Sequence, residues 1–337
     1  MTRRSEVPPP VTAVLDASST WLPARLAEVE DLLREQVSGH GELLAADAGA
    51  TLAAGGKRLR PLLVLLCAGP ESGVEAAAVR AATAIELVHM ATLVHDDVLD
   101  DAPLRRGLPT VFASSGRRRA VAAGDLLFSR AFAILATDGD GPEPSDPATG
   151  RQVELLAHAS VALARGELAQ RRDAYDTSVS IERYQLRCEL KTAALFQCAC
   201  VIGASRAPAE EAALLDFGRA IGLAFQLLDD VLDVLGPPER TGKARGTDLL
   251  DGTVTLPFIL ARERDPGLRE IDLRSLEPDA AEAVCDRIAA TGSPEEVRAE
   301  ARERVASAKR ALRESGVGGE ELQMLELVAD GVVERYS

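Results

Sequence analysis

The segment Glu86-Leu-Val-His-Met-Ala-Thr-Leu-Val-His-Asp-Asp-Val-Leu-Asp100 combines an apolar helical repeat with a row of acidic side chains. His89, Asp96 and Asp100 are separated by seven and four residues, and these separations return to nearly the same angle on an α-helix. The segment therefore predicts one helix with a histidine and two carboxylates on one face. A lone histidine on an apolar helix is usually a core residue, but the shared face favours a role in binding substrate.

A second acidic segment, Asp229-Asp230-Val231-Leu232-Asp233, repeats the pattern of Asp96-Asp97-Val98-Leu99-Asp100. In each copy the first and last aspartates are four residues apart and project from one helix face. Such carboxylate clusters repel each other unless cations bind them, and ligands that are all oxygen favour a hard ion such as Mg²⁺. Magnesium held by carboxylates usually bridges to substrate phosphates, so the two motifs together predict an enzyme that acts on diphosphates.

Basic residues stand close to both acidic motifs. The pair Arg105-Arg106 follows the first motif, where forked guanidinium groups can bind phosphate oxygens. The segment Gly55-Gly-Lys-Arg-Leu-Arg-Pro61 opens a predicted helix, whose N-terminus favours an anion. Weaker candidates in the second half of the chain are Lys191, Thr192, Gln226 and Lys243. We single out Lys191 because an unpaired ammonium on an apolar helix is costly to bury.

Composition limits the class of protein. The chain has 337 residues, 46% of them hydrophobic and 27% charged, which supports a large core. Its net charge of −15 argues against binding to nucleic acid or to anionic membranes, so basic residues must be concentrated locally. No apolar run approaches the roughly 20 residues of a membrane span, and we expect no stable membrane insertion. Five cysteines without metal-site spacing indicate free thiols and a cytoplasmic protein.

An apolar period of 3.6 residues runs through nearly the whole chain, and no alternating strand pattern accompanies it. We expect an all-α protein with a disordered leader at 1–18 and one domain at 19–337. The polar stretch at 138–149 is interpreted as a flexible surface loop, with a domain linker as the alternative. The expected helices are 20–36, 39–54, 58–69, 73–101, 118–137, 150–171, 180–204, 208–236, 253–264, 278–291, 294–314 and 319–335.

In combination these motifs resemble the trans-isoprenyl diphosphate synthase, or polyprenyl synthetase, family, of the bacterial medium- and long-chain type. The resemblance runs from about residue 40 to the C-terminus. It rests on Gly-Gly-Lys-Arg-x-Arg-Pro, on His-Asp-Asp-x-x-Asp followed by Arg-Arg-Gly, and on Phe225-Gln-Leu-Leu-Asp-Asp-x-x-Asp233. It implies the isoprenoid synthase fold, a single-domain helical bundle around a deep central cavity, and a homodimer. The implied reaction is head-to-tail (1'-4) addition of isopentenyl diphosphate to an allylic diphosphate.

The resemblance also implies roles for individual residues. Three Mg²⁺ ions are expected between the acidic helices, with Asp96, Asp100, Asp229 and Asp233 as ligands and Asp97 and Asp230 completing the catalytic motifs together with Lys191. Isopentenyl diphosphate is expected to bind Lys57, Arg60, His89 and Arg106. The allylic diphosphate is expected to bind Arg105, Lys191, Thr192, Gln226 and Lys243. Thr253 replaces the lysine that is frequent in the family, so one phosphate contact is absent or supplied by Arg245.

The residues before the first motif are expected to form the wall that limits product length. Val88, Ala91 and Thr92 include no aromatic residue, so we expect an all-trans product of C30 or longer, with C20 as the main alternative. A class I terpene cyclase is a rival that does not need the isopentenyl site. A noncatalytic subunit of a heteromeric synthase is a second rival, although both acidic motifs are intact.

Overall fold

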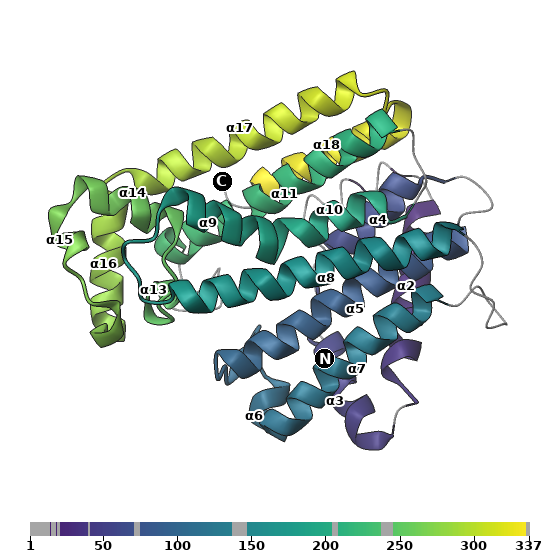
Figure 1. The fold of residues 1–337 in the computed structure, drawn as a ribbon, viewed down its shortest axis with the longest axis horizontal. Helices are drawn as coiled ribbons and strands as arrows, with labels where there is room; N and C mark the ends of the chain where they lie inside the picture. The colour runs from purple at the N-terminus through teal and green to yellow at the C-terminus, as the bar shows by residue number, and fades with distance from the viewer. Residues whose placement is uncertain are drawn as a thin grey trace, which may run out of the picture. The chain divides into compact units, whose positions relative to one another are not determined.

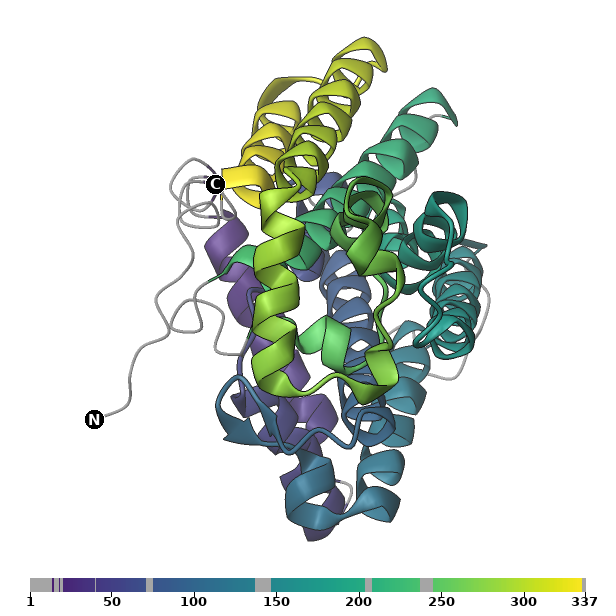
Figure 2. The same cartoon turned by 90° about the vertical axis from the view of Figure 1, so that its left-hand side faces the viewer.

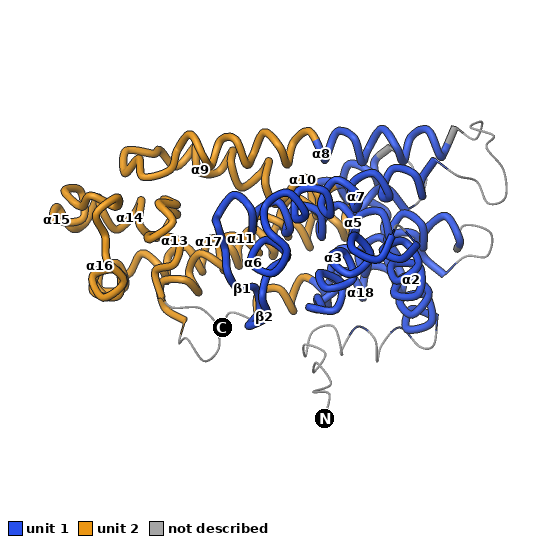
Figure 3. Tube along the Cα trace, turned by 90° about the horizontal axis from the view of Figure 1, so that it is seen from below, with its two compact units in different colours: residues 1–160, 198–215, 315–328 blue, residues 161–197, 216–314, 329–337 orange. Residues whose placement is uncertain are grey.

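The computed structural model describes Val14, Ser18 and residues 21–39, 41–70, 75–136, 147–203, 208–236 and 245–334. It divides into two compact units, coloured separately in Figure 3. Unit 1 comprises residues 1–160, 198–215 and 315–328, and unit 2 comprises residues 161–197, 216–314 and 329–337. Apart from Val14 and Ser18, which are buried, the predicted leader lies outside the described residues, as does 138–146 of the predicted loop.

Unit 1 is built around α5 (Glu75–Leu99). This helix contacts α2, α3, α4, α6 and α7, and Figure 1 shows α5 and α7 running side by side. The other elements of this unit are α2 (Trp21–Val37), α3 (Glu42–Ala53), α4 (Leu59–Ala68), β1 (Leu104–Arg105), β2 (Leu108–Pro109), α6 (Val111–Ser115) and α7 (Arg117–Ala136).

The length and hydrophobicity of α5 contradict one expectation from the sequence, namely that no segment is apolar enough to span a membrane. Its segment Ala76–Leu99 is long and apolar enough to cross a membrane, so the expectation that no such segment exists was wrong. Most of the segment (72%) is buried inside the protein, as expected for the core helix of a bundle. Its apolar residues pack against neighbouring helices, which is the ordinary reason for a helix to be hydrophobic on most of its circumference.

Unit 2 contains most of the residues of the remaining helices and short turns, and its residues 256–290, on the left of Figure 1, face the viewer in Figure 2. Among them α14, α16 and α17 contact one another. Four helices, α8, α10, α11 and α18, have residues in both units. The elements are α8 (Pro147–Asp173), α9 (Ile181–Cys188), the π-helical turn η1 (Glu189–Ala193), α10 (Ala194–Val201), α11 (Pro208–Leu235), α13 (Thr247–Leu250), α14 (Leu256–Arg264), α15 (Pro266–Arg269), η2 (Leu273–Ser275), α16 (Pro278–Ala290), α17 (Ser293–Glu314) and α18 (Gly319–Glu334).

Local sequence explains several helix ends. The Ser180 side chain accepts a hydrogen bond from the Arg183 amide and caps α9, and Thr110 caps α6 through the Ala113 amide. Proline occupies the first turn of α14, α15 and α16, where its missing N–H has no helical partner to lose. All five cysteines are free and buried, as expected for packing residues.

Candidate active site

The first acidic motif lies at the C-terminal end of α5, and its aspartates differ in exposure. Asp96 is half-buried and Asp100 is exposed, whereas Asp97 is only 5% exposed. Asp97 Oδ1 accepts a hydrogen bond of 2.8 Å from Arg105 Nε. A buried carboxylate requires such a partner, since leaving it unpaired costs several kcal/mol. The motif therefore presents two carboxylates outward and anchors the third inside.

Arg105 and Arg106 lie on a small antiparallel hairpin that the sequence did not predict. Leu104 pairs with Pro109, and Arg105 pairs with Leu108. The two turn residues, Arg106 and Gly107, have φ of 54° and 77°, and positive φ at both positions is typical of a tight hairpin turn. Strands of two residues are too short to show an alternating pattern, so they could not be predicted from the sequence.

The hairpin and the glycine-rich loop are brought together in unit 1. The Arg106 guanidinium donates to the Gly55 carbonyl. A Cβ placed on Gly56 would lie 2.8 Å from Arg58 Nη1, 3.5 Å from Glu86 Oε1 and 3.6 Å from Arg106 Nη1. These three side chains therefore converge on the backbone at Gly56. Two basic segments that are about fifty residues apart in the sequence thus form one cluster.

Arg58 links this cluster to α2 and α5. Its Nη1 donates to Glu86 Oε1 at 2.7 Å, and its Nε donates to Glu30. The Glu86 side chain is 4% exposed, so this ion pair is well shielded from solvent. Arg58 also has φ of 51°, an unusual conformation for a residue with a side chain, and non-glycine residues held this way tend to occur at functional sites.

His89 and Arg60 experience strong electrostatic effects in the same cluster. Burial, together with the positive charges of Arg60, Arg106, Arg105 and Arg58, lowers the pKa of His89 well below its usual 6.5. Burial also lowers the pKa of Arg60 to about 10, while nearby Glu86 opposes that shift. His89 is therefore neutral at neutral pH and serves as a hydrogen-bonding group, whereas Arg60 remains a cation.

The second acidic motif repeats the division found in the first. Asp229 is exposed and Asp233 is half-buried, whereas Asp230 is 2% exposed. Asp230 accepts hydrogen bonds from the Tyr184 hydroxyl at 2.5 Å and from Gln226 Nε2 at 2.8 Å. Burial raises the pKa of Asp230 to about 7, and these two donors act against that rise. Burial raises the pKa of Tyr184 well above 10, so its hydroxyl stays a donor at neutral pH.

Lys191 and Thr192 lie in η1, a single π-helical turn between α9 and α10. The expected helix at 180–204 is thus interrupted at its candidate residues, and π-helical turns inside longer helices are frequent at functional sites. Lys191 is paired with Glu167 of α8, so within the chain its ammonium has a partner of opposite charge. The Thr192 hydroxyl donates to Gln226 Oε1 at 2.8 Å, which links η1 to Asp230 through Gln226.

Two glycines allow η1 to pack where it does. A Cβ on Gly166 of α8 would lie 2.5 Å from the Lys191 backbone nitrogen, and one on Gly222 of α11 would lie 2.6 Å from Ala193 Cα. Neither backbone atom can move aside as a flexible side chain would. Glycine at these two positions therefore allows the π-helical turn to approach both helices.

The loop after the second motif is described only from Arg245 onward, so Lys243 lies outside the described residues. Asp233 Oδ2 accepts from the Asp248 amide at 3.3 Å. Arg245 donates to the Val234 carbonyl and to Asp286, both at 2.9 Å. The Arg245 guanidinium, the alternative to the lysine that Thr253 replaces, thus has two partners within the chain, and its role toward a phosphate stays a prediction.

The predicted wall residues occupy different faces of α5. Val88 and Ala91 are fully buried, whereas Thr92 is half-buried, like His89 and Asp96. On a helix Thr92 lies within about 40° of Asp96, while Ala91 lies about 140° away. Thr92 therefore shares the accessible face with the acidic row, and Ala91 packs in the core.

Three partner residues escaped the sequence reasoning: Arg58, Glu86 and Tyr184. Tyr184 holds the predicted residue Asp230, whereas Arg58 and Glu86 hold each other. Two signals were available: Arg58 belongs to the basic segment Gly55–Pro61, and Glu86 is an acid inside the apolar run three residues before His89. Among the described residues, no group of three His, Cys, Asp or Glu side chains is close enough to enclose a metal ion.

Comparison with known proteins assigns the family. Residues 42–289 match the family model described as polyprenyl synthetase. The chain belongs to this family. Heptaprenyl diphosphate synthase component 2 of Geobacillus stearothermophilus is 39% identical over 271 residues, which cover 80% of this chain and 82% of the relative. Octaprenyl diphosphate synthase of Escherichia coli is 35% identical over 240 residues, covering 70% and 71%.

A solved structure agrees with this assignment. Polyprenyl synthase from Caulobacter crescentus, complexed with calcium and isoprenyl diphosphate, matches with a TM-score of 0.84 and 32% identity, covering 96% of this chain and 98% of that one. The polyprenyl synthetase is therefore a prenyltransferase of isoprenoid biosynthesis with the all-α isoprenoid synthase fold, and the expectations for family, fold class and enzyme class are confirmed.

Proposed function

We propose that this prenyltransferase adds isopentenyl diphosphate head-to-tail (1'-4) to an allylic diphosphate and releases an all-trans polyprenyl diphosphate of C30 or longer. The observation that carries the proposal is the common arrangement of the two acidic motifs. In each, the first and last aspartates are accessible and the middle one is buried and anchored. The names of the relatives, a heptaprenyl and an octaprenyl diphosphate synthase, support a medium or long product.

The accessible carboxylates Asp96, Asp100, Asp229 and Asp233 suit Mg²⁺, which prefers hard oxygen ligands and is usually held by one or two carboxylates with substrate phosphates. We propose that they hold three ions with the substrate. Bound Mg²⁺ would neutralise the negative charge that develops on the departing diphosphate. Calcium and isoprenyl diphosphate in the Caulobacter crescentus polyprenyl synthase support a divalent cation next to such a substrate.

The chain's own residues then bind and orient the two substrates. The unit 1 cluster of Lys57, Arg60, His89 and Arg106 would hold isopentenyl diphosphate, with neutral His89 as a hydrogen-bonding group and the cations balancing the diphosphate charge. Lys191, Thr192 and Gln226, together with Lys243, would hold the allylic diphosphate. Arg105 would join them at this second site, while its Nε donates to Asp97 and so positions the first motif.

In this scheme the allylic carbon–oxygen bond breaks and its electron pair leaves with the diphosphate. The isopentenyl double bond attacks the resulting carbocation, and the proton lost from the product passes to the departing diphosphate. No side chain is needed as a dedicated base. We propose that the apolar cavity implied by the family resemblance would protect the cation from water.

The experiment that tests the function is product analysis by mass spectrometry with purified protein, isopentenyl diphosphate, Mg²⁺ and three allylic starters in turn. We expect chains of C30 or longer and no turnover with EDTA. Products no longer than C20 would refute the proposed length, and no turnover with any starter would refute independent catalysis.

A second possibility is suggested by one relative, which is named as component 2 of its enzyme. A name of that kind favours an enzyme that needs another subunit, whereas we propose a cytoplasmic homodimer. Turnover by the purified chain alone, together with its mass in solution, separates the two. Activity that appears only after addition of cell extract would favour the heteromeric enzyme.

A further inference from the structure

Arg187 of α9 is a cation buried inside unit 2. Its side chain is 4% exposed, and no acidic side chain among the described residues forms an ion pair with it. Its Nη2 donates to the Val254 carbonyl at 2.6 Å, and its Nη1 is buried without a hydrogen-bond partner in the described part of the chain. Burying a guanidinium without an acidic partner is costly, so its presence here indicates a role beyond packing.

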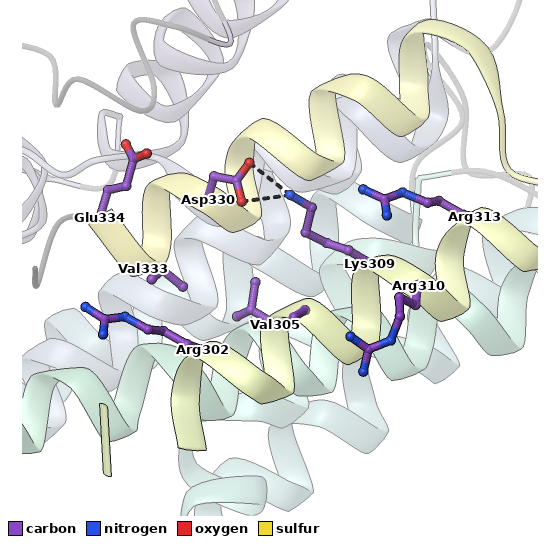
Figure 4. A pocket seen from close by; sticks show the side chains of 9 residues that line it. Arg302, Val305, Lys309, Arg310, Arg313, Asp330, Val333 and Glu334 are labelled. Atoms are coloured by element: carbon purple, nitrogen blue, oxygen red, sulfur yellow. Dashed lines mark hydrogen bonds and ion pairs between the residues drawn. The ribbon is translucent and has the colours of Figure 1, made fainter. Parts of the chain in front are cut away.

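The basic side chains between α17 and α18, drawn in Figure 4, provide a contrast within the same unit. Arg302 and Arg310 are exposed, and Lys309 Nζ lies 2.7 Å from a carboxylate oxygen of Asp330. Water therefore stabilises the first two charges, and a carboxylate neutralises the third. Arg187 is shielded from bulk water and has no such carboxylate.

The bond from Arg187 to a backbone carbonyl joins α9 to residues 247–254, which follow the second acidic motif. Within this segment the Thr253 amide donates to the Asp248 carbonyl at 2.7 Å. The Asp248 amide in turn donates to Asp233 Oδ2 at 3.3 Å. Arg187 is therefore connected to the last aspartate of the motif through a short series of hydrogen bonds.

Arg187 is also connected to the middle aspartate of the motif. Its Cζ lies 5.3 Å from the centroid of the Tyr184 ring, and the Tyr184 hydroxyl donates to Asp230 at 2.5 Å. A cation over an aromatic face is attracted to it, more strongly where water is excluded. Burial raises the pKa of Asp230, and the positive charge of Arg187 acts against that rise. One buried guanidinium thus acts on two aspartates of the motif.

We propose that Arg187 is a positioning residue for the second acidic motif. It fixes the Tyr184 ring and residues 247–254, and through them it holds the carboxylates of Asp230 and Asp233 without touching the substrate. Groups behind metal ligands commonly orient them in this way, and their loss weakens metal binding. The inference rests on the proposed function, because Asp233 is a proposed Mg²⁺ ligand.

The test compares the full-length protein with three single variants. Arg187→Met removes the guanidinium and keeps an unbranched side chain, whereas Arg187→Lys keeps a positive charge and a donor. Arg262→Met is the matched control. Arg262 of α14 also donates to a backbone carbonyl, that of Val179 at 2.8 Å, and also has a buried Nη1 without a partner in the described residues, but its bond is not made to residues 247–254.

Two measurements are made without turnover. Isothermal titration of Mg²⁺ in the presence of inorganic diphosphate gives metal affinity, and hydrogen exchange of the metal-free protein reports on the Asp248 and Thr253 amides. We expect Arg187→Met to weaken Mg²⁺ binding by about tenfold, as loss of a charge-assisted hydrogen bond does, and to speed exchange of both amides. Arg187→Lys should recover most of the affinity, and Arg262→Met should lower the unfolding temperature without changing metal affinity.

Mg²⁺ binding that Arg187→Met leaves unchanged, or a loss of affinity that Arg262→Met matches, would overturn the proposal. If Arg187→Met does not fold, the unaltered protein decides. Binding of Mg²⁺ with diphosphate should then slow exchange of its Asp248 and Thr253 amides, and no slowing would overturn the proposal. An unaltered protein that binds no Mg²⁺ with diphosphate would instead show that the proposed metal site is wrong, and the role of Arg187 with it.

Discussion

Replacing Tyr184 with phenylalanine tests whether the anchored aspartate holds the second acidic motif in place. The Tyr184 ring is buried, and its hydroxyl donates to Asp230 at 2.5 Å. Phenylalanine keeps the ring and its packing and removes only this donor. Because Asp229 and Asp233 lie on the same helix as Asp230, we expect the accessible carboxylates to lose part of their fixed geometry.

The magnitude follows from the kind of bond removed. A hydrogen bond contributes about 0.5–1.5 kcal/mol between neutral groups and about 1.5–3 kcal/mol to a charged group, and with a pKa of about 7 Asp230 populates both forms at neutral pH. Gln226 Nε2 still donates to Asp230 at 2.8 Å, so we expect a loss near the point where these two ranges meet. A loss of 1.4 kcal/mol is about tenfold in an equilibrium constant, so binding of Mg²⁺ with diphosphate should weaken by about tenfold.

The assay measures two quantities on the same samples. Isothermal titration of Mg²⁺ into protein with inorganic diphosphate gives metal affinity, and thermal unfolding gives stability. The control is Tyr175→Phe, which removes the hydroxyl of another tyrosine in unit 2. The centroid of the Tyr175 ring lies 4.6 Å from Arg274 Cζ. We expect Tyr184→Phe to lower both metal affinity and unfolding temperature and Tyr175→Phe to change neither by much. A Tyr184→Phe protein that unfolds earlier but binds Mg²⁺ normally would refute the reasoning.

Three further predictions follow from α5 and α8. Thr92→Phe places an aromatic ring on the accessible face of α5, so it should shorten the products seen by mass spectrometry and leave the unfolding temperature nearly unchanged. Ala91→Phe places the ring in the packed core and should lower the free energy of unfolding by about 1–3 kcal/mol. Product length that responds to Ala91→Phe alone would contradict this. Since the folded-state pKa of His89 is lowered, the unfolded chain binds more protons below pH 6.5 and stability falls with acidity there. In urea unfolding at several pH values, His89→Asn should reduce the acid-side fall in the free energy of unfolding by at most about 1.4 kcal/mol per pH unit. An unchanged pH dependence of that free energy would contradict this prediction. Gly166→Ala should lower unfolding temperature and activity through its clash with η1, whereas Gly150→Ala on the same helix, with open space around it, should be neutral or slightly stabilising. Equal effects of the two substitutions would count against the packing argument.

The sequence predicted the helices well because each carries a long apolar period. The expected helix at 118–137 is α7 at Arg117–Ala136, and the expected helix at 294–314 is α17 at Ser293–Glu314. The period is a property of each segment by itself, so it can be read without knowledge of the fold. Short elements such as α13 and the β1–β2 hairpin contain too few residues to show a period, and they were missed.

The interruption at η1 illustrates a different limit. Nothing in Glu189–Ala193 distinguishes a π-helical turn from an α-helix, since the turn depends on how closely α8 and α11 approach. Gly166 and Gly222 permit that approach, but in the sequence they are two separate glycines within apolar helices. The candidate residues Lys191 and Thr192 were found by their chemistry, whereas their partner Glu167 and their backbone geometry required the tertiary structure.

Helical geometry explains why both acidic motifs divide their three aspartates in the same way. Adjacent residues on an α-helix are about 100° apart, whereas residues four apart are within about 40°. The middle aspartate lies about 100° from the first and about 60° from the last, and in both helices this angle places it at the packed side. There it needs a donor, and Arg105 supplies one to Asp97 while Tyr184 supplies one to Asp230. The two donors are unrelated in sequence and structure, so the shared arrangement follows from the spacing of the aspartates.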